Sequence, residues 1–201
     1  YGEFFFENLP IIREREKWDL ETWERFQNEM FKKLIRHAYS KVPFYRKLWR
    51  SIGIDIERID NVKEIISLPF TLKEDVRRYN VDFLDEDLKS NKLFHEHTSG
   101  TTGTPLDLWW TKKVSQTWYA FFEARVKNWG GVSLGERWAM LGGQVIIPVK
   151  RTRPPFWIWN KAFNQLYMSS YHLREDFIPH YLDEIQKRHI TYLYGYASSL
   201  Y

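Results

Sequence analysis

The sequence has 201 residues, of which 43% are hydrophobic, 28% charged and 18% aromatic, and its formal net charge is +4. This composition excludes a disordered chain, and the absence of cysteine excludes disulfide frameworks and thiolate metal sites. Basic and acidic residues are interleaved, as in residues 13–17, which favours a mixed solvated surface over a nucleic-acid-binding stripe. The apolar runs are far shorter than the roughly 20 residues of a membrane span, and we expect a cytoplasmic protein without one.

Residues 1–90 are expected to form a mainly helical amino-terminal segment. Apolar residues recur at three- and four-residue steps between Leu20 and Ala38, which predicts an amphipathic helix. A second helix is expected from Pro43, a good first-turn residue, to near Gly53. Thr71 and Glu74 have the spacing of a capping box, in which each side chain satisfies a free backbone N–H, and we expect a short helix through residue 78.

Residues 91–201 are expected to form an α/β portion, and the two portions together one incomplete domain. Leu93–His97 and Leu106–Thr111 are strand candidates joined by a polar, glycine-containing loop. Residues 149–160, rich in proline and tryptophan, predict a loop or irregular connection whose role the sequence does not reveal. The remaining expected elements are helices at 114–128 and 176–189 and strands at 137–141 and 190–194. Alternating helices and strands favour an α/β sheet with helical cover.

The loop at residues 98–105 has the composition of a phosphate-binding segment. Gly100 and Gly103 allow the backbone to turn and a ligand to approach closely, and several hydroxyl and N–H groups are available as donors. The loop lacks the Lys-Ser/Thr ending of a Walker loop and is followed by a strand pattern, so the architecture of P-loop enzymes does not apply. From composition alone, an ordinary Ser/Thr/Gly-rich turn explains these residues as well.

The segment from Thr98 to Pro105 resembles the phosphate-loop signature of adenylate-forming enzymes. Residues 42–46, 68–75 and 194–200 resemble, in the same order, segments of phenylacetate–CoA ligases and of the related capsular polysaccharide biosynthesis proteins. The chain is therefore similar to the amino-terminal portion of such an enzyme, including part of its large amino-terminal domain. Leu106 stands where many adenylate-forming enzymes have lysine, and the capsular branch shares an apolar residue at this position, which favours that branch.

This resemblance implies ATP-dependent activation of a carboxylic acid as an acyl-adenylate, often followed by transfer to CoA. The implied cofactors are ATP, Mg²⁺ and CoA, and the implied partners are a nucleotide and a small-molecule carboxylic acid. The expected contacts to the ATP phosphates come from Thr98, Ser99, Gly100, Thr101, Thr102, Gly103 and Thr104. The family's later motifs, with a Mg²⁺-binding glutamate, a ribose-binding aspartate and an adenylating lysine, have no match before Tyr201. We therefore assign no catalytic residue and expect an incomplete, inactive part of the enzyme.

A possible acyl-substrate pocket is expected near the end of the chain. Ligands in open α/β sheets bind at the carboxyl ends of the strands, and a strand candidate ends at residue 194. The expected pocket residues are Tyr194, Gly195, Tyr196, Ser198 and Ser199. The serines could equally cap the start of a helix.

Two alternatives to this interpretation remain open in the sequence. His95 and His97 would face the same side of a strand, a spacing that suits a metal, but no third ligand is identifiable and we interpret them as ordinary strand histidines. A non-catalytic binding or interaction module with a basic, aromatic surface is the alternative to an enzyme. Titration with ATP would separate the two functions.

Overall fold

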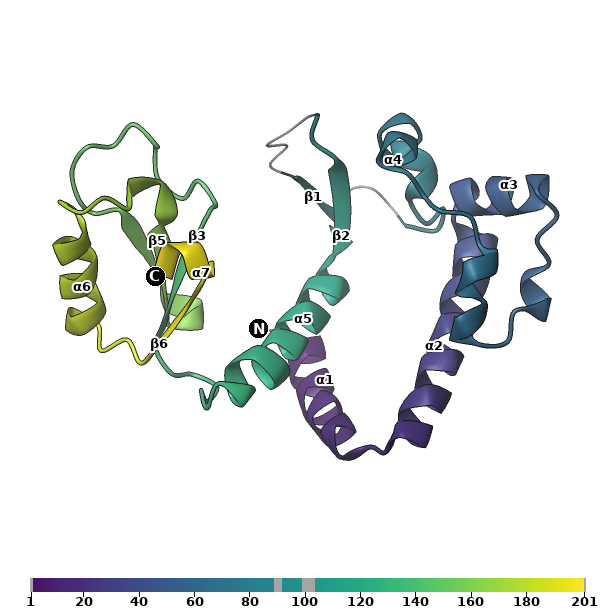
Figure 1. Cartoon of the computed structure of the whole chain (residues 1–201), viewed down its shortest axis with the longest axis horizontal. Coiled ribbons are helices and arrows are strands. Elements are labelled where there is room, and N and C mark those ends of the chain that lie inside the picture. Colours follow the sequence, from purple (N-terminus) through teal and green to yellow (C-terminus); the bar gives the residue numbers. More distant parts are fainter. Residues whose placement is uncertain (1, 89–91, 99–103, 201) are drawn as a thin grey trace. The chain divides into compact units, whose positions relative to one another are not determined.

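Residues 2–88, 92–98 and 104–200 are described by a computed structural model of the chain, which combines helices with two β-sheets (Figure 1). The predicted α/β class is confirmed. The chain divides into two compact units, residues 1–124 and 125–201. The division at residue 90 into a helical segment and an α/β portion stays a prediction about domains.

The first unit begins with three helices, α1 (Glu3–Glu14), α2 (Leu20–Lys41) and α3 (Pro43–Ser51). The two helices predicted for this region are α2 and α3. Asp19 caps α2 by accepting a hydrogen bond from the Thr22 amide at 2.9 Å, and hydrogen bonding from the Thr22 side chain and amide lowers the pKa of the Asp19 carboxyl. The apolar face of α2 packs with α3 and the segment that follows it into a core of Phe31, Ile35, Ala38, Trp49, Ile56 and Ile59.

Short helical turns connect this core to the rest of the first unit. They are η1 (Arg15–Lys17), η2 (Ile56–Arg58), η3 (Val62–Ser67), α4 (Lys73–Arg78) and η4 (Asn80–Phe83). The predicted helix through residue 78 is confirmed as α4, but its predicted capping pair is wrong. Because α4 begins at Lys73, its N-cap is Leu72, whose N–H donates to the Asp75 carboxylate at 3.0 Å. Glu74 pairs instead with Arg77, at 3.2 Å.

A two-stranded ribbon and a helix complete the first unit. Strands β1 (Leu93–His97) and β2 (Asp107–Thr111) pair antiparallel, and α5 (Lys112–Phe121) follows β2 directly. Both strands were predicted from the sequence, although β2 begins one residue later than expected. The predicted helix over residues 114–128 is present but changes to a π-helical turn, η6, at Phe122–Lys127.

Helix α1 has no counterpart among the predicted elements, and it packs against α5. The buried residues are Phe5, Leu9 and Ile12 of α1, Ala120 of α5 and Ala124 of the following turn η6. Pro10 lies inside α1, where proline is normally unfavourable. The helix is therefore stabilised mainly by burial of its apolar face rather than by its intrinsic propensity.

The second unit contains a four-stranded sheet in the order β4-β5-β3-β6. Strand β3 (Trp138–Gly142) is parallel to β5 (Gln165–Ser169) and to β6 (Tyr192–Gly195), and β4 (Trp157–Asn160) is antiparallel to β5. The helical elements are η7 (Lys161–Phe163), η8 (Ser170–His172), α6 (Ile178–Lys187) and α7 (Ala197–Leu200). Strands β3 and β6 and helix α6 correspond to predicted elements, with shifted ends.

Apolar residues from strands, loops and α6 form the core of this unit. Its buried members are Ala139, Leu141, Ile147, Phe156, Leu166, Met168 and Tyr181. The Phe156 side chain is fully buried, and its ring lies 4.6 Å from that of Phe177 and 4.9 Å from the imidazole of His172. Phe156 is therefore at the centre of the aromatic packing.

The prediction of an irregular connection over residues 149–160 is wrong for its last part. Residues 157–160 form β4, which pairs with the unpredicted strand β5. The two prolines at 154 and 155 precede this strand rather than interrupt it. Within the described ranges, no helix combines the length and apolarity needed to cross a membrane.

Candidate functional site

The ribbon of β1 and β2 brings together the two ends of the predicted phosphate loop. Beyond the last strand pair, His97 with Asp107, the Thr98 N–H donates to the Leu106 carbonyl at 3.0 Å. The Leu106 N–H donates in return to the Thr98 hydroxyl oxygen, also at 3.0 Å. Thr98 and Thr104 are both exposed. The predicted phosphate contacts Ser99, Gly100, Thr101, Thr102 and Gly103 lie outside the described residues.

Helix α4 contacts the outgoing end of this loop, and turn η4 contacts the strand that follows it. The Arg77 guanidinium donates to the Thr104 carbonyl at 2.6 Å. Asn80 donates its amide to the Asp107 carbonyl at 3.2 Å and accepts a hydrogen bond from the Trp109 indole at 3.1 Å. Neither Arg77 nor Asn80 was predicted from the sequence. Because their partners lie 27 to 29 residues away along the chain, no local sequence pattern indicates these contacts.

His95 lies on the exposed face of the ribbon and interacts with β2. Its Nε2 is 2.8 Å from the Asp107 carboxylate, and its ring stacks on the Trp109 indole at 4.3 Å. His97 is exposed and lies directly opposite Asp107 in the register. Among the residues that the structure describes, no three His, Cys, Asp or Glu side chains form a group that could hold a metal ion.

The predicted acyl-pocket residues lie where β6 ends. Three parallel strands of the second unit end together, because Gly142 pairs with Ser169 and Leu141 pairs with Gly195. Tyr194 and Gly195 are the last residues of β6, and Tyr196 follows with 67% of its surface exposed. We call this region the carboxyl edge of the sheet.

Ser198 and Ser199 lie within α7 rather than before it. The helix begins at Ala197, and the Ser199 N–H donates to the Tyr196 carbonyl at 2.8 Å. The alternative in which a serine caps this helix is therefore wrong, since both serines are inside its first turn. Both hydroxyls are still carried by the segment that directly follows the carboxyl edge.

Glycines allow close packing at the carboxyl edge. A Cβ atom on Gly195 would lie 2.7 Å from the Leu141 carbonyl oxygen, a distance that no side chain tolerates. A Cβ atom on Gly143 would meet only the Tyr196 ring, at 3.8 Å. Gly195 is thus required for β6 to approach β3 closely. At Gly143, by contrast, there is space for a Cβ atom beside the exposed Tyr196 ring.

A buried polar pair behind the carboxyl edge was missed by the sequence analysis. The Ser169 hydroxyl and the His172 Nδ1 are 2.9 Å apart, and both residues are more than nine-tenths buried. The Tyr181 hydroxyl donates to the Ser169 carbonyl at 2.8 Å, and burial raises the pKa of Tyr181 to about 12. The only local signal was a Ser-Ser-Tyr-His run, and its burial depends on residues far away in the sequence.

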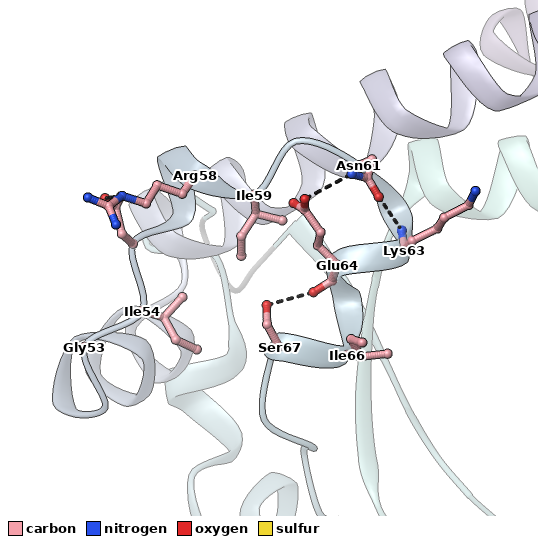
Figure 2. Close-up of a pocket in the computed structure, with 10 residues that line it drawn as sticks. Gly53, Ile54, Arg58, Ile59, Asn61, Lys63, Glu64, Ile66 and Ser67 are labelled. Carbon is pink, nitrogen blue, oxygen red and sulfur yellow. Dashed lines mark hydrogen bonds and ion pairs between the residues drawn. The ribbon is translucent and has the colours of Figure 1, made fainter.

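A shallow hollow of about 740 Å³ lies between η2 and η3 in the first unit (Figure 2). Several of its polar groups are engaged with one another. Asn61 donates to the Glu64 carboxylate at 3.0 Å and accepts from the Lys63 N–H at 3.0 Å, while Ser67 donates to the Glu64 carbonyl at 2.7 Å. We assign no ligand to this hollow, because these groups already satisfy one another.

Comparison with known proteins gives matches that cover the whole chain or about half of it. Over its full length the chain is 27% identical to Protein CapK of Staphylococcus aureus, of which it covers 43%. Over 58% of its length it is 32% identical to a phenylacetate-coenzyme A ligase of Aromatoleum evansii, and over 47% it is 32% identical to the ligase of the same name from Thermus thermophilus. No protein-family model matches.

The resemblance predicted from the sequence is confirmed by these comparisons. The chain spans less than half the length of the curated relatives it matches, at 43% of CapK and 26% and 22% of the two ligases. It is similar to a portion of these proteins, consistent with an amino-terminal portion of an adenylate-forming enzyme of this type.

Proposed function

We propose that this chain is part of an enzyme that activates a carboxylic acid with ATP as an acyl-adenylate and then transfers the acyl group to CoA or another acceptor. The observation that carries the proposal is similarity to CapK over the full chain, together with similarity over about half of it to enzymes named phenylacetate-coenzyme A ligase. The alternative of a non-catalytic interaction module is not favoured, because the relatives named above include ligases.

The proposed first step is a displacement at the α-phosphorus of ATP. A carboxylate oxygen attacks this phosphorus and forms the acyl-adenylate C–O–P linkage. The bond to the bridging oxygen of the β-phosphate breaks, and pyrophosphate leaves with the electron pair. Because both reactants are anions, hydrogen-bond donors fixed near the phosphates lower the barrier by offsetting their charge.

The described residues at the two ends of the phosphate loop support this proposal. Thr98 accepts a hydrogen bond at its hydroxyl oxygen, so its hydroxyl hydrogen can still donate to a phosphate. Thr104 is exposed, and the Arg77 guanidinium, which is paired with Glu74, donates to the Thr104 carbonyl at the loop's outgoing end. In this proposal Thr98, Ser99, Thr101, Thr102 and Thr104 donate to the phosphates, while Gly100 and Gly103 let the backbone approach.

The described residues offer a candidate site for the acid but no candidate set of Mg²⁺ ligands. The part of the chain that the structure describes offers no set of three metal-ligating side chains, so we assign no step of the reaction to Mg²⁺ here. For the acid, we propose the carboxyl edge of the sheet, where Tyr194 and Tyr196 supply rings beside Gly195. Ser198 and Ser199 supply hydroxyl groups on the segment that follows.

Calorimetric titration of the chain with ATP tests the nucleotide part of this proposal. We expect saturable binding that Gly100→Val abolishes, because a branched side chain blocks the approach of phosphate to the backbone. The variant should melt at the same temperature as the wild type. Absence of ATP binding, or binding that survives the substitution, would contradict the assignment of the loop.

A second assay addresses catalysis. Acid-dependent release of pyrophosphate from ATP is measured with a panel of aryl, fatty and sugar acids. We expect this 201-residue chain to bind ATP without turnover, since it corresponds to less than half of its relatives and lacks their expected later motifs. Robust release would show that these residues already contain a complete catalytic site.

A further inference from the structure

The outgoing end of the phosphate loop is held by a segment far away in the sequence. Helix α4 and turn η4 together, residues 73–83, make three hydrogen bonds to residues 104–109, and we call this segment the brace. Arg77 bonds the Thr104 carbonyl, and Asn80 bonds both the backbone and the indole of β2. Arg77 therefore contacts the loop itself, whereas Asn80 contacts the strand beyond it.

The Arg77 guanidinium interacts with two groups at once. One terminal nitrogen donates to Thr104 at 2.6 Å, and the other pairs with the Glu74 carboxylate at 3.2 Å. Only 32% of the side chain is exposed. Glu74 is on the same helix, so this ion pair orients the planar guanidinium toward the loop. A hydrogen bond from a charged donor is stronger than one between neutral groups.

The ribbon that carries the loop has little core of its own. Four of the five residues of β1 are exposed, and no residue of β2 is fully buried. An isolated two-stranded ribbon is marginally stable in water. The incoming end of the loop is held within the ribbon by the paired bonds between Thr98 and Leu106. The outgoing end is held by Arg77.

We propose that Arg77 is a positioning residue for ATP, which fixes the outgoing end of the phosphate loop before the nucleotide arrives. Fixing Thr104 in advance reduces the conformational entropy that binding must otherwise remove. The contact acts through the Thr104 backbone, so its effect does not depend on a side chain at position 104. This inference rests on the proposed nucleotide function, and the experiment below separates the two.

The chain offers matched controls for this inference. Arg78 is the next residue on α4, carries the same charge and lies near the Tyr79 ring at 5.5 Å, so Arg78→Ala removes the same charge without the loop contact. Glu74→Gln removes the ion pair but leaves the Arg77 bond to Thr104 possible. Arg77→Lys retains a charged donor, but the lysine side chain is shorter and lacks the planar guanidinium that can donate to two acceptors in a fixed geometry.

Two measurements are made on each variant. The dissociation constant for ATP is measured by calorimetry, and hydrogen exchange of peptides covering residues 92–111 is measured without nucleotide. We expect Arg77→Ala to weaken ATP binding roughly tenfold or more and to speed exchange of the Thr98 and Leu106 amides. Arg77→Lys should recover part of both losses. Arg78→Ala should match the wild type, and Glu74→Gln should fall between the two.

The results distinguish failure of this inference from failure of the proposed function. If the wild type binds no ATP, the proposed function fails, and exchange without nucleotide still decides whether Arg77 holds the loop. Unchanged exchange and unchanged ATP affinity in Arg77→Ala would overturn the inference. Faster exchange throughout α2 and α3 would also overturn it, because it would indicate general destabilisation of the first unit rather than a local clamp.

Discussion

The two candidate regions of this protein are carried by sheets of opposite character. The ribbon of β1 and β2 leaves four of the five residues of β1 exposed, whereas β3 and β5 each bury four of five. The proposed nucleotide loop extends from the exposed ribbon. The proposed acid pocket lies at the carboxyl edge of the four-stranded sheet, on the edge strand β6, which has no buried residue itself but pairs with the buried β3.

This difference implies that substitutions should affect the two regions in different ways. At the carboxyl edge the backbone is positioned by packing, so a substitution that disturbs it also lowers the free energy of unfolding. At the ribbon the backbone is positioned by a few hydrogen bonds from the brace, so loss of one loosens the loop while the core of α2 and α3 stays folded.

Phe156→Ala should strongly destabilise the second unit. The side chain is fully buried and contacts the rings of His172, Phe177 and Tyr181, so its removal leaves a cavity. We expect the free energy of unfolding to fall by about 3–5 kcal/mol, measured by urea denaturation. The control is Phe70→Ala, whose side chain is 94% exposed, and it should have little effect. A small loss in Phe156→Ala would contradict the packed core.

Gly195→Ala should destabilise the carboxyl edge by about 1–3 kcal/mol, because the added methyl meets the Leu141 carbonyl oxygen at 2.7 Å and backbone must shift. The matched control is Gly143→Ala, where the methyl makes an ordinary contact at 3.8 Å with the Tyr196 ring. The two variants are compared by urea denaturation of the same unit. Equal stabilities would contradict the close approach of β6 to β3.

The buried Tyr181 hydroxyl should make the second unit sensitive to alkali. Its pKa is raised from 10.0 to about 12 in the folded protein, so the neutral form is favoured by folding. The resulting stabilisation is complete below pH 10 and is lost as the pH rises through about 12. We expect a decline on the order of 2 kcal/mol across this window.

The Tyr181→Phe variant supplies the control for this pH dependence. It lacks the titrating hydroxyl, and it also lacks the hydrogen bond to the Ser169 carbonyl. The wild type should therefore be more stable below pH 10, and the difference between the two proteins should shrink toward pH 12. Parallel stability curves for the two proteins over this range would contradict the assigned role of burial.

The elements that could be predicted from the sequence are those with local signals. Helix α2 has a long amphipathic repeat, and the ribbon has two short strands around a polar glycine loop. Helix α1 and strand β5 were missed, because each depends on distant partners: α1 on the small residues of α5, and β5 on the strands at both its sides. Strand β4 was not predicted, because the Pro154-Pro155 pair directly before it was interpreted as part of a connection.

Local sequence signals also decide which residues of the candidate site could be predicted. The phosphate loop was recognised because its glycine and hydroxyl residues are contiguous and match a family signature. Arg77 could not be identified, since its contact with Thr104 spans 27 residues and uses a backbone carbonyl, which leaves no trace in residue type at position 104. The Ser169 and His172 pair was missed because its burial depends on Phe156 and Tyr181.

Hydrogen exchange with and without ATP tests the central claim, that the exposed ribbon carries the nucleotide site, most directly. Saturating ATP should slow exchange in peptides that cover residues 92–111 and the brace, and Gly100→Val should abolish this protection while leaving exchange in α2 unchanged. The claim would be contradicted if ATP protected other segments and left residues 92–111 unaffected, or if the Gly100→Val protein were protected as strongly as the wild type.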